Sequence, residues 1–417
     1  MSDSDLSVAS GFSSDDDDDS VDNVARLRSW QVLKPGAPAK VRILVESLRM
    51  ARLQHKPRSE LAEALSELRH HILLHGLPEC DTELNDFEQQ KDSLNSDKRK
   101  VERTFRGTVW LLLMQLPRVK TQCYRDLLRD WPGIDKRAYE KIRGDTFRTL
   151  PTDTLFKATV PEQRLIRVLC AIHRSVSQRT LTNDSVAVGY AQGMNLIAAP
   201  FLAMLPELDA FFAVSIFLRQ WVPTYWVTVP GHAMPGVHAG VQLAWNTLEK
   251  CDPELFKALK KRKLPPNLYF YPFINSCMMC CPPFREALKL FDFVLAFGPQ
   301  TIPLCAVALA VIYRKELMGA SNPTKVMGAN SFPRLEAGRV IRLVVQFLQH
   351  YAKDEELKLL AGHATNLQCC AKILRKRSLR DRQPSYWADY VACTELLALE
   401  PKAEVARRLP SIQESPP

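Results

Sequence analysis

This sequence has no long hydrophobic runs. Its longest apolar stretches, Leu196 to Leu205 and Ile302 to Tyr313, have 10 and 12 residues, whereas a membrane-spanning helix needs about 18 or more. The N-terminus has neither the basic flank nor the apolar stretch of a secretory signal. We therefore expect a cytoplasmic protein without a membrane span.

The signatures of nucleotide-binding and hydrolytic enzymes are also missing. No Gly-rich phosphate loop precedes a Lys-Ser/Thr pair, and Gly-x-Gly-x-x-Gly, His-Glu-x-x-His, Gly-x-Ser-x-Gly and the kinase motifs are absent. The chain is therefore not expected to bind a nucleotide through a loop of its own.

Two groups of residues partly match the spacing of metal ligands. They are the pair His71 and His75, four residues apart on an expected helix, and the cysteines Cys277, Cys280, Cys281, Cys369 and Cys370. A structural zinc needs four ligands, usually as two close pairs, and cysteine is one of the residues most often buried. We favour a solvated or half-buried histidine pair and reduced, buried thiols, and we expect no metal.

Glycine is scarce, at 16 of 417 residues, and the alternating runs of a β-sandwich are absent. Apolar residues instead recur at three- and four-residue steps, which is typical of helices. The pattern predicts an all-α fold with helices over 40–54 and 59–75, the second with Ser59 as a cap and Gly76 and Pro78 as a stop. Further helical stretches follow from 104 to 328 and over 334–361, with Pro200 kinking or dividing one of them.

Acidic and basic residues are unevenly distributed. Residues 1–23 hold eight Asp and no Lys or Arg, so the rest of the chain has 56 basic against 38 acidic residues. Five consecutive Asp repel one another and bury nothing, which predicts a disordered tail. We expect four regions: this acidic tail (1–23), an N-terminal helical extension with a linker (24–103), a helical domain (104–328) and a C-terminal helical extension with a basic segment (329–417).

The segment from Ile142 to Asp153 holds an arginine in an unusual setting. Ile142 and Phe147 are expected to anchor it to a core, and Asp145 lies three residues before Arg148, close enough on a helical turn to brace the guanidinium group. Leu150-Pro151 then ends any helix. This predicts an Arg148 that is held in place but remains accessible.

A second segment, Gly189 to Asn195, places an amide in a similar setting. Two glycines flank Tyr190 and Gln192 at a break before an apolar helix. An exposed arginine and glutamine together suit GTP hydrolysis, because a guanidinium group neutralises charge on the transferred phosphoryl group and an amide orients the attacking water. From the residues alone, an ordinary ion pair and a solvated glutamine are the competing interpretation.

Both segments resemble the signature motifs of the TBC family of GTPase-activating proteins. Residues matching the I-x-x-D-x-x-R motif are Ile142, Asp145 and Arg148, and those matching Y-x-Q-G are Tyr190, Gln192 and Gly193. Arg106 and Trp110 match the R-x-x-V-W run at the start of the family's domain. Residues 291–298 resemble a late helix, with Phe291 in place of the usual Trp as a change of packing. The resemblance spans residues 76–328.

The resemblance implies an all-α TBC domain in two helical subdomains that stimulates GTP hydrolysis by a Rab-like small GTPase. Arg148 would be the arginine finger and Gln192 the glutamine finger, both supplied in trans, so that the chain is an activator and not an enzyme in its own right. Asp145 would orient Arg148, and Tyr190 would pack beneath the Gln192 loop. GTP and Mg²⁺ would belong to the partner GTPase, with no cofactor of the chain's own.

Within the family, the runs 145–149 and 194–200 are most similar to the fungal branch that controls mitotic exit and septation. That resemblance implies a spindle-pole or cytoskeletal location and a separate scaffold protein as a second partner. Two alternatives stay open: a scaffold that binds a GTPase without accelerating hydrolysis, and nucleic-acid binding through the six basic residues of 372–382. Because no nucleic-acid module accompanies that segment, we expect no nucleic-acid partner.

Overall fold

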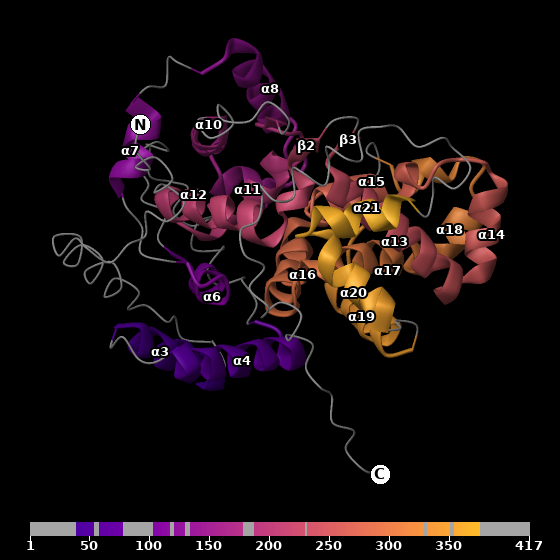
Figure 1. Ribbon diagram of the computed structural model, residues 1–417, viewed down its shortest axis with the longest axis horizontal. Coiled ribbons are helices and arrows are strands. Elements are labelled where there is room, and N and C mark those ends of the chain that lie inside the picture. The colour runs from indigo at the N-terminus through magenta and orange to yellow at the C-terminus, as the bar shows by residue number, and fades with distance from the viewer. Residues whose placement is uncertain are drawn as a thin grey trace, which may run out of the picture.

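The computed structural model describes residues 39–53, 58–77, 103–116, 121–129, 134–177, 187–229, 232–328, 332–350 and 354–375. Within these ranges the chain is helical apart from one small sheet, which confirms the all-α prediction (Figure 1). The acidic tail (1–23), most of the linker before residue 103 and the basic segment beyond residue 375 lie outside the described residues. The domain boundaries expected from the sequence stay a prediction.

The first half of the molecule groups its helices around α10 and α11. They are α6 (Phe105–Leu113), α7 (Thr121–Arg129), α8 (Lys136–Phe147), α9 (Thr154–Thr159), α10 (Glu162–Ser177), α11 (Met194–Met204) and α12 (Glu207–Ile216), which continues as the π-helical turn η5 (Phe217–Trp221). Asp side chains start two of these helices: Asp135 accepts from the amide of Ala138 on α8, and Asp153 accepts from that of Phe156 on α9.

The second half groups its helices around α13, which packs against α15, α17 and α21. They are α13 (Pro235–Cys251), α14 (Pro253–Lys261), α15 (Asn267–Asn275), α16 (Phe284–Phe297), α17 (Ile302–Ile312), α18 (Arg314–Gly319), α19 (Ala337–His350), α20 (Asp354–His363) and α21 (Leu367–Arg375), with short 3₁₀ turns η6 (Pro223–Tyr225), η7 (Pro299–Thr301) and η8 (Pro323–Lys325). The two groups occupy different sides of the molecule, as the predicted two subdomains require (Figure 1).

A cluster of aromatic rings joins the two groups. The Trp110 ring packs edge-on against Phe201 and Phe291, with centroid distances of 5.7 and 5.2 Å. Phe217, the first residue of the π-helical turn, packs on Phe291 at 5.5 Å. Such edge-to-face pairs favour one relative placement of the helices that carry them. Phe291 is fully buried in this cluster, consistent with a change of packing at that position.

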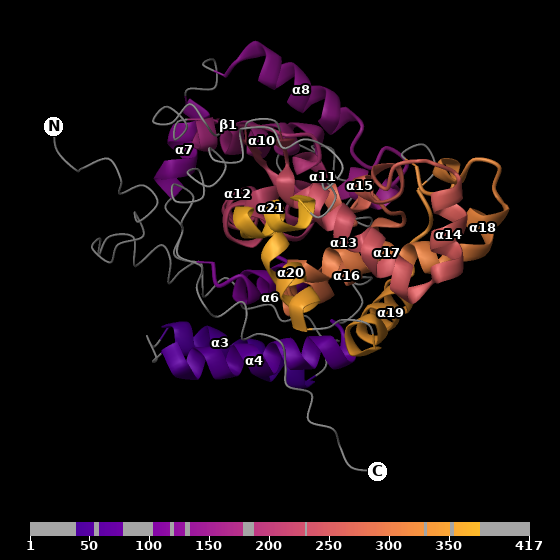
Figure 2. The same cartoon turned by 45° about the vertical axis from the view of Figure 1, so that its right-hand side comes forward.

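The N-terminal extension is a pair of helices, α3 (Ala39–Leu53) and α4 (Arg58–His75), that lies along α6 and α16 (Figures 1 and 2). Arg69 on α4 donates to the carbonyl of Leu113 at the end of α6, at 3.2 Å. Gly76 has a φ of +70° and its amide bonds to the carbonyl of Ile72, which ends α4 as expected. In the described ranges no helix is long and apolar enough to cross a membrane.

Three details differ from the sequence-based expectations. α4 begins at Arg58, so Ser59 lies inside its first turn and not before it. Pro200 lies inside α11 without dividing it. A small antiparallel sheet pairs β1 (Ala187–Val188), β2 (Val227–Val229) and β3 (His232–Ala233), with Ala187 opposite Thr228 and Thr228 opposite Ala233. Strands of two or three residues are too short for an alternating pattern to reveal.

Candidate functional site

Helix α8 has one buried face and one exposed face. Ile142 and Asp145 lie on its buried face, and Ile142 has no exposed surface. Phe147, which the sequence analysis expected to anchor the segment to the core, is 77% exposed, so that expectation is wrong. A helix turns about 100° per residue, so five residues after Ile142 the chain faces a different direction. Arg148 follows as the C-cap residue.

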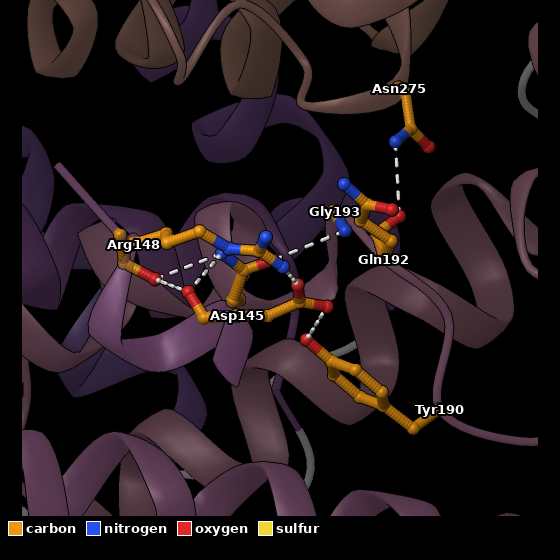
Figure 3. A network of polar contacts seen from close by, with 8 residues as sticks. Asp145, Arg148, Tyr190, Gln192, Gly193 and Asn275 are labelled. Atoms are coloured by element: carbon orange, nitrogen blue, oxygen red, sulfur yellow. Dashed lines mark hydrogen bonds and ion pairs between the residues drawn. The ribbon is translucent and has the colours of Figure 1, made fainter. Parts of the chain in front are cut away.

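Asp145 is the centre of a polar network that joins the two predicted segments (Figure 3). One carboxylate oxygen accepts from Nη2 of Arg148 at 2.8 Å, and the other accepts from the hydroxyl of Tyr190 at 3.0 Å. The Asp145 side chain is 5% exposed while that of Arg148 is 70% exposed. The buried carboxylate thus holds one side of a guanidinium group that otherwise faces solvent.

Tyr190, in the second segment, is buried and contacts Asp145 of the first. Burial raises the pKa of its phenol, and the charge and hydrogen bond of Asp145 raise that pKa further. The hydroxyl therefore stays protonated and donates to Asp145 at any physiological pH. The Lys141 ammonium lies 5.8 Å from the centre of the Tyr190 ring, within the range of a cation–π contact. Tyr190 therefore contacts α8 at both Lys141 and Asp145.

The loop that carries Gln192 is held by its backbone, which leaves the side chain exposed. Gly193 has a φ of +106°, in the left-handed region that favours glycine. Its amide donates to Oδ1 of Asn195 at 3.1 Å. Nδ2 of Asn195 donates in turn to the carbonyl of Asp145 at 3.2 Å and to Oγ1 of Thr149 at 2.9 Å. Asn195 therefore ties the Gln192 loop to the end of α8 that precedes Arg148.

Asn275, at the end of α15, holds the same loop from the other side. Its Nδ2 donates to the carbonyl of Gln192 at 3.0 Å (Figure 3). A Cβ atom on Gly193 would lie 2.5 Å from this Nδ2, so a side chain at that position would collide with Asn275. No signal in the sequence pointed to Asn275, because it lies 83 residues from Gln192 and belongs to neither motif.

His173 of α10 anchors the start of the loop. Its Nδ1 accepts from the amide of Tyr190 at 3.1 Å. Burial lowers the pKa of His173, against the opposing charge of Asp135. A neutral ring is required here, since Nδ1 accepts a hydrogen bond only when it carries no proton. No local signal in the sequence pointed to this contact.

Arg106 and Trp110, predicted as supporting residues, belong to a second network in the core. Nε of Arg106 donates to both carboxylate oxygens of Asp292 at 3.0 Å, and Nε1 of Trp110 donates to one of them at 2.8 Å. Burial raises the pKa of Asp292, although Arg106 and Trp110 act to lower it. These two residues therefore join α6 to α16 and lie apart from the Asp145 network.

The groups considered as metal ligands are placed as follows. The rings of His71 and His75 are 4.7 Å apart at an angle of 49°. Cys277, Cys280 and Cys281 are buried, and burial raises the pKa of the Cys277 and Cys281 thiols. Among the residues that the structure describes, no group of three or more His, Cys, Asp or Glu side chains is arranged to hold a metal ion.

The Asp145 network exposes two groups of complementary chemistry. Arg148 offers a delocalised positive charge with forked donors, and Gln192 offers an amide that both donates and accepts. The carboxylate of Asp145 holds the guanidinium group of Arg148, and the hydroxyl of Thr149 bonds to the Asp145 carbonyl. Asn195 and Asn275 hold the backbone on either side of the Gln192 side chain. Such a surface is suited to stabilising negative charge and positioning a water on another molecule.

Comparison with known proteins gives a consistent result. A model of the Rab-GTPase-TBC domain family matches residues 103–318, just over half of the chain. A putative mitotic check point protein BUB2 of Dictyostelium discoideum is 33% identical over 300 residues, covering 72% of this chain and 74% of its own. The mitotic check point protein BUB2 of Saccharomyces cerevisiae is 32% identical, covering 73% and 94%.

A third relative extends the same pattern. The cell division control protein 16 of Schizosaccharomyces pombe is 28% identical over 321 residues, covering 77% of this chain and 95% of its own. The similarity to these three proteins therefore reaches beyond the residues that the family model matches.

Proposed function

This chain belongs to the Rab-GTPase-TBC domain family, and on that premise we propose that it accelerates GTP hydrolysis by a Rab-type small GTPase. Arg148 and Gln192 act in trans on GTP and Mg²⁺ that the partner holds. The chain is thus an activator that supplies catalytic residues. Arg148 neutralises charge that develops on the transferred phosphoryl group, and Gln192 orients the attacking water.

The observation that supports this proposal is the shared anchoring of the two side chains. Asp145 bonds to Arg148 through its carboxylate and, through its carbonyl, to Asn195 at the start of α11, which in turn bonds to the Gln192 loop. Positioned groups lower a barrier because they need no reorganisation when charge develops. An arginine finger contributes about 10³–10⁵ in rate, or about 4–7 kcal/mol of the barrier.

The relatives named as mitotic check point and cell division control proteins suggest the cellular role. We propose that the activator acts in mitotic exit and the timing of cell division. A location at the spindle pole or cytoskeleton and a separate scaffold partner stay predictions.

A single-turnover assay tests the proposal. The full chain is titrated against a panel of Rab-type GTPases loaded with GTP, and the rate of phosphate release is compared with the intrinsic rate. We expect a large acceleration for at least one GTPase, lost in Arg148→Ala and in Gln192→Ala. Binding that depends on GTP without any acceleration would instead identify a scaffold.

A further inference from the structure

The end of helix α8 exposes an aromatic ring next to Arg148. Phe147 is the last residue of the helix, and its exposed fraction of 77% is the highest among the large hydrophobic side chains that the structure describes. The next most exposed of these side chains are aliphatic and lie on other helices: Ile43, Leu74 and Leu268. Covering an apolar ring that is exposed to water lowers the free energy of the complex.

Phe147 continues a row of exposed residues along α8. Lys136, Glu140, Arg143 and Phe147 are spaced by four, three and four residues, which places them on one face of the helix, and all four are exposed. We call this row the outer face of α8. The outer face is therefore apolar at the Arg148 end and carries two basic residues, Lys136 and Arg143, and one acidic residue, Glu140, toward the start of the helix.

We propose that the outer face of α8 is a docking surface for the GTP-bound small GTPase, with Phe147 as its anchor. This inference rests on the proposed function and adds how the partner is held. Because Arg148 must reach the partner's nucleotide, its neighbour Phe147 must lie against the partner's surface beside the nucleotide site. The matching partner surface is an apolar recess bordered by acidic side chains.

The backbone under Phe147 is fixed before any partner arrives. The carbonyl of Asp145 accepts from Oγ1 of Thr149 at 2.8 Å, and the Thr149 amide bonds to the carbonyl of Thr146 at 3.0 Å. The ring itself has only two rotatable bonds, so little conformational freedom is lost when it docks. Rigid aromatic side chains of this kind are typical of the residues that dominate binding energy at interfaces.

The experiment compares Phe147→Ala with Leu74→Ala, a control in which an exposed apolar side chain is shortened on the distant helix α4. In single-turnover titrations with the GTPase that responds to the wild type, we expect Phe147→Ala to raise the half-saturating concentration about tenfold or more. The maximal rate stays within about twofold. Leu74→Ala leaves both values unchanged, and Phe147→Leu gives an intermediate half-saturating concentration.

Binding to the same GTPases loaded with a non-hydrolysable GTP analogue separates this inference from the proposed function. Weaker binding by Phe147→Ala supports the docking surface even if the wild type accelerates nothing. If Phe147→Ala binds the loaded GTPase with the same affinity as the wild type and still accelerates hydrolysis, the docking surface is overturned and the proposed function stands. A wild type that neither binds nor accelerates any GTPase of the panel overturns both.

Discussion

Two arginine–aspartate pairs in this molecule have the same chemistry and opposite surroundings. Arg106 and Asp292 are 3.0 Å apart, with side chains that are each 3% exposed, whereas Arg148 and Asp145 are 2.8 Å apart and the arginine is 70% exposed. In the first pair both charges are removed from water and satisfied by each other. In the second, only the carboxylate is buried, and the guanidinium group keeps donors for another molecule.

The comparison teaches that a motif residue's surroundings, and not its type, indicate its role. Both arginines belong to runs that resemble the same family. One joins helices α6 and α16 in the core, and the other lies at the end of α8 beside the Gln192 loop. Substitutions should therefore separate stability from activation of the partner.

The largest effect is expected at Arg148. Arg148→Ala should lower the stimulated rate of GTP hydrolysis by about 10³–10⁵-fold. The free energy of unfolding should change much less than at Arg106, by about 1 kcal/mol, because the Arg148 guanidinium group is exposed and Asp145 keeps its hydrogen bond from Tyr190. Single-turnover hydrolysis and urea unfolding of the same preparation measure the two quantities. An activator that keeps its rate without this guanidinium group would contradict the assignment.

Arg106 should behave in the opposite way. Arg106→Ala leaves the Asp292 carboxylate buried without its partner, which should cost about 3–5 kcal/mol of unfolding free energy. A double variant, Arg106→Leu with Asp292→Asn, removes the orphaned charge and keeps an acceptor for Trp110, so it should recover part of the loss. Urea unfolding monitored by circular dichroism checks both. A loss below about 1 kcal/mol in the single variant would show that the pair is not a structural link.

A buried histidine extends the comparison to pH. Burial lowers the pKa of His363 to about 4. Its Nδ1 lies 2.6 Å from the carbonyl of Leu360 and must carry the proton, so Nε2 accepts from the hydroxyl of Tyr225 at 2.9 Å. In the unfolded chain the pKa is about 6.5.

The sign of the effect follows from these two values. The folded state binds fewer protons than the unfolded state between them, so stability is full above pH 6.5 and falls as the pH falls toward 4. The loss over this interval should be about 3 kcal/mol. Urea unfolding at several pH values measures it, and His363→Gln should remove this part of the pH dependence. An identical pH profile in that variant would refute the assignment.

The smallest effect is expected at Asn275, which acts through the backbone of Gln192. Asn275→Ala should lower the stimulated rate about tenfold, the equivalent of one positioning hydrogen bond. In a Gln192→Ala background the same substitution should have no further effect on rate, since the group it positions is gone. A rate loss that is equal in both backgrounds would show that Asn275 supports the fold in general.

The features that could be predicted from the sequence are those that depend on residues close together in the chain. Apolar periodicity gave the all-α fold, and the three-residue spacing anticipated the contact between Asp145 and Arg148. Phe147 was misplaced because a position five residues from Ile142 lies about 140° away around a helix, so the two cannot share a buried face. The roles of Arg148 and Gln192 come from the family resemblance and await the hydrolysis assay.

Long-range contacts account for the rest. His173 and Asn275 reach the Gln192 loop across 17 and 83 residues, and Asp292 reaches Arg106 across 186. A single sequence contains no periodicity or spacing that pairs such residues. The small sheet escaped for a different reason, since its strands have two or three residues each.

The helices outside residues 103–318 matter for the choice of boundaries of a recombinant fragment. α4 covers α16 and bonds to the end of α6, while α19 lies on α17 and the α20–α21 pair is tied to Tyr225 through His363. A recombinant fragment cut to the boundaries of the family match would uncover apolar surface on both sides and invite aggregation. The helices that pack against residues 103–318 from either side therefore belong in any recombinant form of this protein.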